Sequence, residues 1–276
     1  NKLMPEGPEV RVIADTIEKA VGKTTIDVWH TQNKKYKWKR DGIPGWDKLT
    51  EDGKVWTFDK VDVKGKLIRI DISRIKGAKR LSMLSTLGLE GFWAWEVDDS
   101  QKKHKRITFE FLNGSKLSYY DSRNFGTLRI MKPEEADKKM KKIGFDLLQG
   151  TMPQIDWANL KTSKKLAKRP IGEALMRQTE FSGIGNIYKA ETLYALGINP
   201  TTLVEDCDAW DDVQEVAHKI MADSYAVKGS SVKSYAGGSF QRSLQVYKKD
   251  QCPKGHKIQS VKQKDRTTWY CPTCQK

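Results

Sequence analysis

Between Thr24 and Met131 the chain is a succession of short runs in which apolar and polar residues alternate. The runs are TIDVW, VWTFD, KLIRIDI, RLSML, GFWAW, RITFEF, KLSYY and TLRIM. Alternation with a period of two is typical of strands that bury one face, and Asn113-Gly114 between two of the runs indicates a hairpin turn. So many short strands at close spacing predict an antiparallel sandwich or barrel.

A helix is expected ahead of these strands. Pro8 suits the first turn of a helix, because the N–H that proline lacks would have no partner there. Apolar residues then recur at helical spacing, and Gly22 is placed to end the helix. They are Val10, Ile13, Ala14, Ile17 and Val21. The sequence therefore predicts an amphipathic helix packed against the core.

The pattern turns helical after Pro133. The helical segments are EEADKKMKKI, IDWANL, IGEALMRQ, IYKAETLYALG and DAWDDVQEVAHKIMADSYAV. A stretch rich in Gly and Ser, from Lys228 to Phe240, predicts a loop, and the tail from Leu244 returns to a strand pattern.

These changes of pattern predict a two-domain α+β protein. Residues 1–131 are expected to form the N-terminal helix and an antiparallel β-sandwich. Residues 132–243 are expected to form a helical domain, and residues 244–276 a β-hairpin that holds a metal.

The chain is strongly basic. Its 50 Lys and Arg residues against 35 Asp and Glu give a formal net charge of +15. The basic residues are spread along the chain, which favours a folded surface that meets a polyanion such as nucleic acid. A cationic protein without such a partner is the alternative. No apolar run reaches the length of a membrane span and the start does not resemble a signal peptide, so we expect an intracellular protein that is not secreted.

The tail reads CPKGHKIQSVKQKDRTTWYCPTC. Cys252, His256, Cys271 and Cys274 follow the pattern C-x3-H-x14-C-x2-C, in which two close pairs are separated by the length of a hairpin. Such a set of thiolates and imidazole suits one tetrahedral zinc ion, with thiols that bind no metal as the alternative. All four positions are filled by protein, so this zinc is expected to be structural. Cys207 stands apart, and a buried thiol is its default reading.

The hairpin between the ligand pairs carries Lys262, Lys264 and Arg266. A hairpin held by zinc can present such a residue to a phosphate with little remaining flexibility. Arg266 alone could equally be a solvated loop charge.

A second candidate anion site is FSGIGNIYKAETLYALGINPTT, where two glycines and Asn186 come directly before a helix. Backbone N–H groups at a helix start bind anions readily. Asn186 could cap the helix or give its amide to a phosphate. Without further context, a capped turn is the simpler interpretation.

The segment GIGNIYKAETLYALGINP resembles the helix–two-turns–helix element of the formamidopyrimidine-DNA glycosylase and endonuclease VIII family. RTTWYCPTCQ resembles the terminal zinc finger of that family, and PEGPEV resembles its catalytic start. The three motifs stand in the right order and span nearly the whole chain. The histidine at the second metal position resembles a subgroup of eukaryotic endonuclease VIII-like enzymes.

The resemblance implies a bifunctional DNA glycosylase and AP lyase of base excision repair, acting as a monomer on DNA with oxidised bases or abasic sites. By position, Pro5 would attack C1′ of the damaged nucleoside, the base would leave, and elimination from the iminium would cut the strand. Glu6 would transfer protons and Glu9 would order the site. An α-amine with a pKa near 7.7–8 is partly neutral and nucleophilic at neutral pH, which fits this role.

The resemblance also assigns contacts to DNA. Lys66, Asn186 and Arg266 would grip the phosphate backbone, although Lys66 could be an ordinary strand charge. Leu89, Arg123 and Phe125 would fill the gap that a flipped nucleotide leaves, although Leu89 and Phe125 could be core residues. The loop from Ser230 to Phe240 is short for an enzyme specialised for 8-oxoguanine, which favours oxidised pyrimidines.

Pro5 follows Met4, so its nitrogen is a tertiary amide that cannot form an iminium. We expect Met4 to be the biological start and an aminopeptidase to remove it, with residues 1–3 an artificial addition. If residues 1–3 are instead natural, the protein could be a non-catalytic reader of damaged or single-stranded DNA. A zinc-ribbon protein of a larger nucleic-acid assembly would explain the tail and the charge, but neither PEGPEV nor GIGN.

Overall fold

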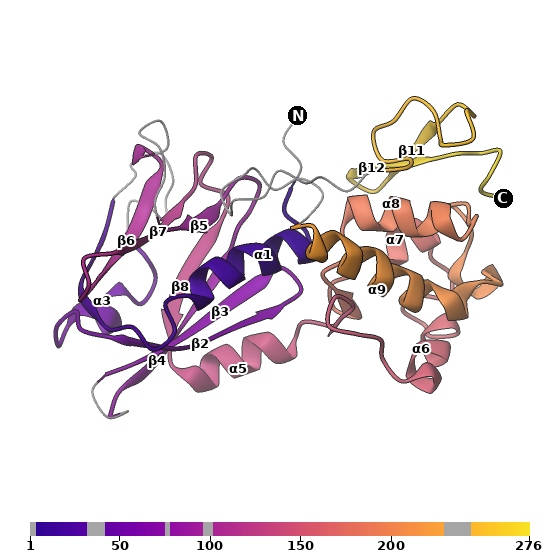
Figure 1. Cartoon of the computed structure of the whole chain (residues 1–276). Helices are drawn as coiled ribbons and strands as arrows, with labels where there is room; N and C mark the ends of the chain where they lie inside the picture. The colour runs from indigo at the N-terminus through magenta and orange to yellow at the C-terminus, as the bar shows by residue number, and fades with distance from the viewer. Residues whose placement is uncertain (1–3, 32–41, 75–77, 96–101, 229–243) are drawn as a thin grey trace. The chain divides into compact units, whose positions relative to one another are not determined.

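The computed structural model describes residues 4–31, 42–74, 78–95, 102–228 and 244–276 (Figure 1). They fall into two compact units. Unit 1 contains residues 4–5 and Glu9–Lys142, and unit 2 contains Glu6–Pro8 with residues 143–228 and 244–276. The three-part division expected from the sequence stays a prediction.

Unit 1 is built around two four-stranded antiparallel sheets. The first has the order β1-β6-β7-β5, and the second has the order β2-β3-β4-β8. Their bounds are β1 Thr25–His30, β2 Thr57–Lys64, β3 Leu67–Ser73, β4 Arg80–Thr86, β5 Phe92–Ala94, β6 Lys105–Phe111, β7 Lys116–Tyr120 and β8 Thr127–Met131. Each of the eight predicted strand runs contributes one strand, which confirms the antiparallel sandwich.

The core of unit 1 lies between the sheets. Phe58 of β2 packs edge-on against Phe109 and Phe111 of β6, with ring centroids 5.2 and 5.4 Å apart. The predicted Asn113-Gly114 turn joins β6 to β7, and the Asn113 side chain accepts a hydrogen bond from the Ser115 N–H. Aromatic burial on both inner faces is the main stabilising contribution expected for such a sandwich.

Helix α1 (Gly7–Glu18) has the predicted buried stripe of Val10, Ile13, Ala14 and Ile17. Val21 does not belong to it, because its side chain is 40% exposed. The helix ends at Glu18, and Val21 instead forms an isolated bridge with Phe58. Because Val21 lies outside the helix, helical spacing does not determine whether its side chain is buried. Among its described residues, unit 1 also contains α3 (Trp46–Thr50), which the sequence did not suggest, and α5 (Pro133–Lys141).

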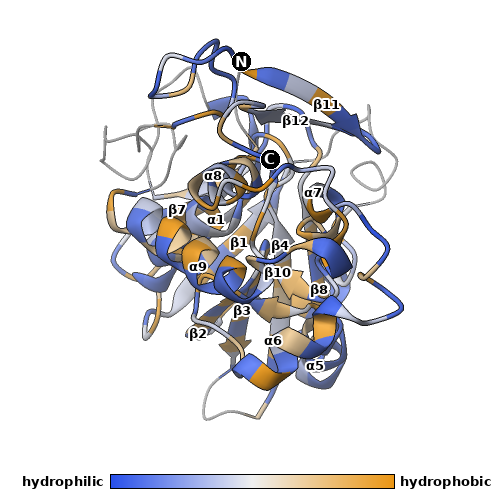
Figure 2. Ribbon diagram, turned by 90° about the vertical axis from the view of Figure 1, so that its right-hand side faces the viewer, coloured by the Kyte–Doolittle hydropathy of each residue, from blue (hydrophilic) through white to orange (hydrophobic). Residues whose placement is uncertain are grey.

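Unit 2 is helical, with α6 Gln154–Lys161, α7 Ile171–Ala174, α8 Asn186–Ala195, α9 Trp210–Ala226 and a 3-10 turn at Val204–Asp206. Trp157 and Trp210 stack 4.6 Å apart, and each indole N–H donates to the backbone carbonyl of the other residue. The ribbon of α9 alternates between orange and blue segments, as an amphipathic helix should (Figure 2). None of the helices formed by the described residues is both long and apolar enough to cross a lipid bilayer.

Helix α7 is shorter than the predicted IGEALMRQ segment. It ends at Ala174, and the chain then turns through Arg177, which pairs with Glu180 at 2.9 Å. The turn leads into β10 (Phe181–Ser182), which pairs in parallel with β9 (Phe145–Asp146). The tail forms the expected hairpin of β11 (Gln259–Gln263) and β12 (Arg266–Tyr270), which packs against α8 (Figure 1).

Candidate functional site

The start of α8 is capped by a side chain from far away in the sequence. Gly185, the residue before the helix, has extended backbone and no side chain to cap it. The Glu6 carboxylate does so instead, accepting the N–H groups of Ile187 at 3.0 Å and Tyr188 at 3.3 Å. A Cβ on Gly185 would lie 2.2 Å from the Glu6 carboxyl carbon, so only glycine leaves room for this cap. Glu6 is 3% exposed, and the helix start stabilises its negative charge.

In the sequence, the other two predicted catalytic residues come just before and shortly after Glu6. Pro5 is half-buried, precedes the helix and is bonded to Glu6, while Glu9 is buried in the first turn of α1. Their catalytic roles remain predictions.

Asn186 does not cap α8. It is the first residue of the helix, and its side-chain Nδ2 donates to the backbone carbonyl of Thr267 in β12 at 2.7 Å. Asn186 Oδ1 is buried without a hydrogen-bond partner among the described residues. The side chain therefore joins the predicted anion site to the hairpin that carries Arg266.

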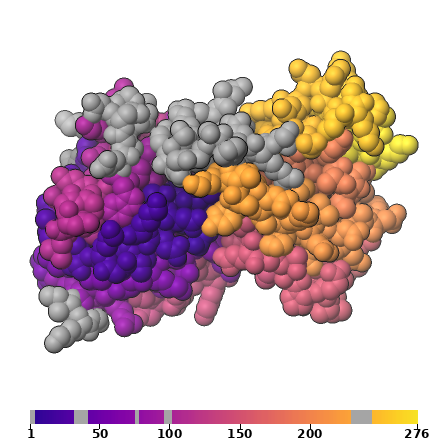
Figure 3. Space-filling view, viewed as in Figure 1, coloured from indigo at the N-terminus to yellow at the C-terminus, as the bar shows by residue number. Residues whose placement is uncertain are grey.

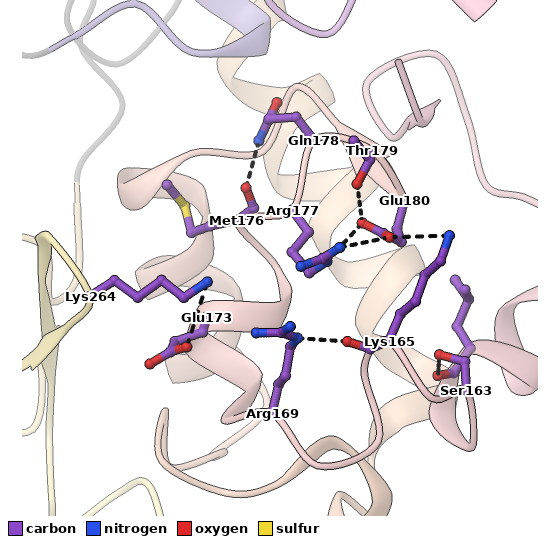
Figure 4. A network of polar contacts seen from close by, with 11 residues as sticks. Ser163, Lys165, Arg169, Glu173, Met176, Arg177, Gln178, Thr179, Glu180 and Lys264 are labelled. Carbon is purple, nitrogen blue, oxygen red and sulfur yellow. Dashed lines mark hydrogen bonds and ion pairs between the residues drawn. The ribbon is translucent and has the colours of Figure 1, made fainter. Parts of the chain in front are cut away.

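Arg266 is the first residue of β12, and 43% of its side chain is exposed. Its guanidinium lies 3.9 Å from the Asp265 carboxylate, a long ion pair that leaves the charge available to solvent. The neighbouring turn residue Lys264 reaches toward Glu173 of α7, with 4.0 Å between the charged atoms (Figure 4). The tip of the hairpin is thus basic and lies on the surface of unit 2.

In unit 1, Lys66 lies in the two-residue turn between β2 and β3, and not within a strand as the sequence suggested. Lys64 pairs with Leu67 across the turn, so Gly65 and Lys66 are its tip. Lys66 is therefore a half-buried turn residue and not an ordinary strand charge.

Leu89, Arg123 and Phe125 lie in two adjoining loops of unit 1. Leu89 is half-buried in the turn after β4, and Phe125 is 51% exposed with the Arg123 guanidinium over its ring. A Cβ on Gly88 would lie 2.5 Å from the Gly126 nitrogen, so the two loops touch through backbone at this point. Exposed Phe125 is not a core residue, which removes that alternative for it.

A buried carboxylate that the sequence analysis missed shapes this loop. Asp121 is fully buried and accepts hydrogen bonds from the backbone N–H groups of Arg123, Asn124 and Gly126 and from the Tyr119 hydroxyl. Burial, and then the negative charge of Asp121, hold the pKa of Tyr119 well above its usual range. Asp121 is the first residue of DSRNFG, and this position was the available signal. An Asp side chain often accepts hydrogen bonds from backbone N–H groups that follow it in a turn.

The four predicted metal ligands converge. One ligand atom from each of Cys252, His256, Cys271 and Cys274 lies within 4.8 Å of the others. His256 Nδ1 is 3.6 Å from the Cys252 sulfur and 3.3 Å from the Cys274 sulfur. Zinc bonds of about 2.1 Å to nitrogen and 2.3 Å to sulfur, at tetrahedral angles, require separations of roughly 3.6 Å. These residues fit a single structural zinc with His256 bound through Nδ1.

The fold and this set of residues define a two-unit DNA-repair protein with a zinc finger at its end, and the comparisons with known proteins agree. Residues 4–128 match the formamidopyrimidine-DNA glycosylase N-terminal domain, and residues 143–236 match the formamidopyrimidine-DNA glycosylase H2TH domain. Formamidopyrimidine-DNA glycosylase of Mycoplasma mobile is 32% identical over 284 residues, which cover 99% of both chains. The Mycoplasma genitalium enzyme of the same name is 30% identical over 290 residues, covering 99% of this chain and 96% of the relative.

Solved structures give the same result. The Lactococcus lactis Fpg in complex with DNA that contains an abasic site superposes with a TM-score of 0.82 at 27% identity, covering 98% of this chain and 99% of that one. MutM in complex with DNA that contains carbocyclic 8-oxo-G has a TM-score of 0.82 at 26% identity, covering 99% and 100%. The chain belongs to the formamidopyrimidine-DNA glycosylase and endonuclease VIII family, so it is a DNA glycosylase of base excision repair. The endonuclease VIII-like subgroup stays a prediction.

Proposed function

We propose that this protein is a bifunctional DNA glycosylase and AP lyase that uses the Pro5 amine once residues 1–4 have been removed. The observation that carries the proposal is the placement of Glu6. Its carboxylate is fixed at the start of α8 by two backbone N–H groups, and Pro5 is the residue bonded to it. A nucleophile beside a carboxylate that is held in place is the arrangement that acid–base catalysis at a sugar carbon requires.

The proposed reaction proceeds in two steps. The neutral secondary amine of Pro5 attacks C1′, and the bond to the damaged base breaks with its electron pair going to the base, which takes up a proton. The Pro5 nitrogen then loses its proton, the C1′–O4′ bond opens with O4′ taking up a proton, and an iminium is left at C1′. Loss of the C2′ proton from this iminium expels the 3′ phosphate and cuts the strand. Glu6 supplies and removes protons in these steps, and Glu9 orders the site.

The proposed substrate is DNA that carries an oxidised base, with pyrimidines favoured, or an abasic site. A net charge of +15, the turn position of Lys66 and the exposed guanidinium of Arg266 support a polyanionic partner. The relatives in the solved complexes hold abasic-site and 8-oxo-G DNA. The pyrimidine preference is supported by the short segment from Ser230 to Phe240, which lies outside the described residues.

The test is reductive trapping. The chain that begins at Pro5 is mixed with duplex DNA containing an abasic site and treated with borohydride, and the adduct is mapped by mass spectrometry. We expect a covalent adduct on Pro5 and strand cleavage without borohydride. The chain with residues 1–4 attached is the matched control and should give no adduct on that nitrogen.

An absent adduct with tight binding retained would contradict the proposal and favour a non-catalytic reader of damaged DNA. Parallel excision assays with thymine glycol, 5-hydroxyuracil and 8-oxoguanine test the substrate preference. Faster release of 8-oxoguanine than of either pyrimidine would overturn that part alone.

A further inference from the structure

A lysine is buried where the hairpin meets α8. Lys189 has no exposed surface, although it carries a charge and lies in the third position after Asn186. Its Nζ donates a hydrogen bond of 2.7 Å to Thr268 Oγ1 in β12. A buried ammonium group is stable only when polar partners offset its loss of hydration. The burial of Lys189 therefore points to a role for the polar groups around it.

The contact is one link of a buried chain. Thr268 Oγ1 donates to Gln263 Oε1 at 2.7 Å, and Gln263 Nε2 donates to the backbone carbonyl of Pro200 at 2.8 Å. Thr268 is fully buried and Gln263 is 5% exposed. We call Lys189, Thr268 and Gln263 the latch. Because Gln263 ends β11 and Thr268 lies in β12, the latch connects both strands of the hairpin to the helical part of unit 2.

The latch encloses the residues that carry Arg266. Gln263 pairs with Arg266 across the hairpin, and Thr268 follows Arg266 by two positions. Between them, the Thr267 carbonyl accepts the Asn186 amide. Lys189, Gln263 and Arg266 also line one cavity of about 210 Å³. The backbone on both sides of Arg266 is therefore fixed from the α8 side.

The zinc site cannot fix this region by itself. Cys271 directly follows β12 and His256 precedes β11, so the metal ties the open end of the hairpin. Arg266 lies at the other end, five residues from Cys271, which is about 16 Å along a strand. In Figure 3 the C-terminal segment, in yellow, is on the surface. A hairpin tip at the surface is mobile unless contacts of its own hold it.

Burial lowers the pKa of Lys189 to about 8, and the charge of Arg266 adds to that shift. Glu6 and Glu173 act in the opposite direction. At neutral pH the group therefore still carries a proton to donate, and it is close enough to Arg266 for the two charges to interact.

We infer that Lys189 is a positioning residue for Arg266: through the latch it holds the tip of the zinc hairpin so that the guanidinium meets a DNA phosphate. This inference rests on the phosphate-gripping role given to Arg266 under the proposed function. Nothing in it requires Lys189 to touch DNA.

The test is a double-mutant cycle on binding to duplex DNA with a tetrahydrofuran abasic analogue, which needs no chemistry at Pro5. Arg266→Ala should weaken binding about tenfold and lower the slope of log affinity against log salt by about one, as for one lost phosphate contact. Lys189→Met should weaken binding about fivefold. The double variant should bind no worse than Arg266→Ala, because Lys189 acts through Arg266.

Thr268 supplies the matched variants. Thr268→Val removes the hydroxyl at nearly constant volume and should reproduce the loss of Lys189→Met, whereas Thr268→Ser keeps the hydroxyl and should bind as wild type. Lys219→Met, which removes an exposed lysine of α9, is the charge control and should change binding less than twofold. Metal content and thermal unfolding show whether each variant is folded. If Lys189→Met does not fold, the comparison of Thr268→Val with Thr268→Ser still tests the inference.

Additive losses in the double variant, with a second unit of salt slope lost, would show that Lys189 contacts a phosphate itself and would overturn the inference. Wild-type binding by both Lys189→Met and Thr268→Val would also overturn it. A failure of the proposed function is distinguishable, because it would appear as absent trapping at Pro5 while this binding cycle is unchanged.

Discussion

The hairpin tip that carries Arg266 and the loop that carries Arg123 and Phe125 both present exposed side chains above buried polar groups. They differ in how the groups that hold them are distributed. The hairpin has a metal site at one end and the latch at the other, with the Asn186 amide between them. The Arg123 loop is organised around the carboxylate of Asp121, which accepts three backbone N–H groups. Arg106 also donates to the Asn124 side chain and to the Asp121 carbonyl of this loop. The hairpin is therefore tied to separate elements along its length, whereas in the loop one carboxylate satisfies most of the buried backbone N–H groups, so that a single substitution should loosen the loop more than the hairpin.

Removing the metal from the hairpin should have the largest effect. Cys271→Ser takes away one of four ligands, so we expect the zinc content to fall from one per chain to near zero. The free energy of unfolding of unit 2 should fall by more than about 3 kcal/mol, since ligand binding stabilises only the folded site. Metal analysis and thermal unfolding measure both. Cys207→Ser, at a buried cysteine outside the site, should keep its zinc; loss of zinc there would show that the assigned ligands are incomplete.

Asp121→Ala tests the main buried acceptor of the other region. The substitution leaves three backbone N–H groups and the Tyr119 hydroxyl without their acceptor in a buried site. We expect a loss of about 3 kcal/mol in the free energy of unfolding, measured by denaturant titration. Asp121→Asn keeps the shape and one acceptor oxygen, so its loss should be smaller. Equal stability of Asp121→Ala and wild type would mean that the loop is held by something else.

Phe125→Ala separates function from stability in the same loop. Because the ring is 51% exposed, the free energy of unfolding should change by less than about 0.5 kcal/mol. If the ring fills the gap left by a flipped nucleotide, excision from duplex DNA should slow about tenfold, a cost of about 1.4 kcal/mol. Leu112→Ala, at a residue 72% exposed on the β6–β7 turn, is the control and should excise normally. An unchanged rate for Phe125→Ala would remove the ring from the gap-filling role.

The smallest expected effect is the pH dependence of Lys189. Its pKa is about 8 in the folded protein, against 10.5 for an ordinary lysine, so between these values the unfolded chain binds more protons. Stability contributed by this group therefore rises with pH from about 8 to 10.5. The difference in Tm, wild type minus Lys189→Met, should become more positive between pH 7.5 and 9.5. A difference that is constant with pH would mean that Lys189 does not titrate in this range.

Local patterns were sufficient to predict much of the fold. Strand alternation and turn residues are properties of neighbours in the sequence, so all eight strands of the sandwich were found. The metal ligands were found for the same reason, because their spacing alone brings Cys252 and His256, and then Cys271 and Cys274, into close pairs. The pattern failed where tertiary contacts decide, as at Val21, which forms a bridge with Phe58 instead of continuing α1.

The anchors beneath the candidate site could not be predicted in this way. Lys189 meets Thr268 across 79 positions and Glu6 meets Ile187 across 181, and nothing in either local sequence marks its partner. In isolation, Lys189 reads as one more charge on an amphipathic helix. Only the packed structure reveals that its side chain is buried, which is the fact that distinguishes it from the solvated lysines around it.

We propose that Pro5 attacks the sugar while Asn186 and Arg266 hold the DNA backbone beside it. The decisive experiment is a structure of the borohydride-trapped complex, formed from the chain that begins at Pro5. We expect a covalent bond between the Pro5 nitrogen and C1′, with the Arg266 guanidinium and the Asn186 side chain within hydrogen-bond distance of phosphates next to that sugar. A sugar joined to any other residue, or phosphates far from Arg266 and Asn186, would contradict it.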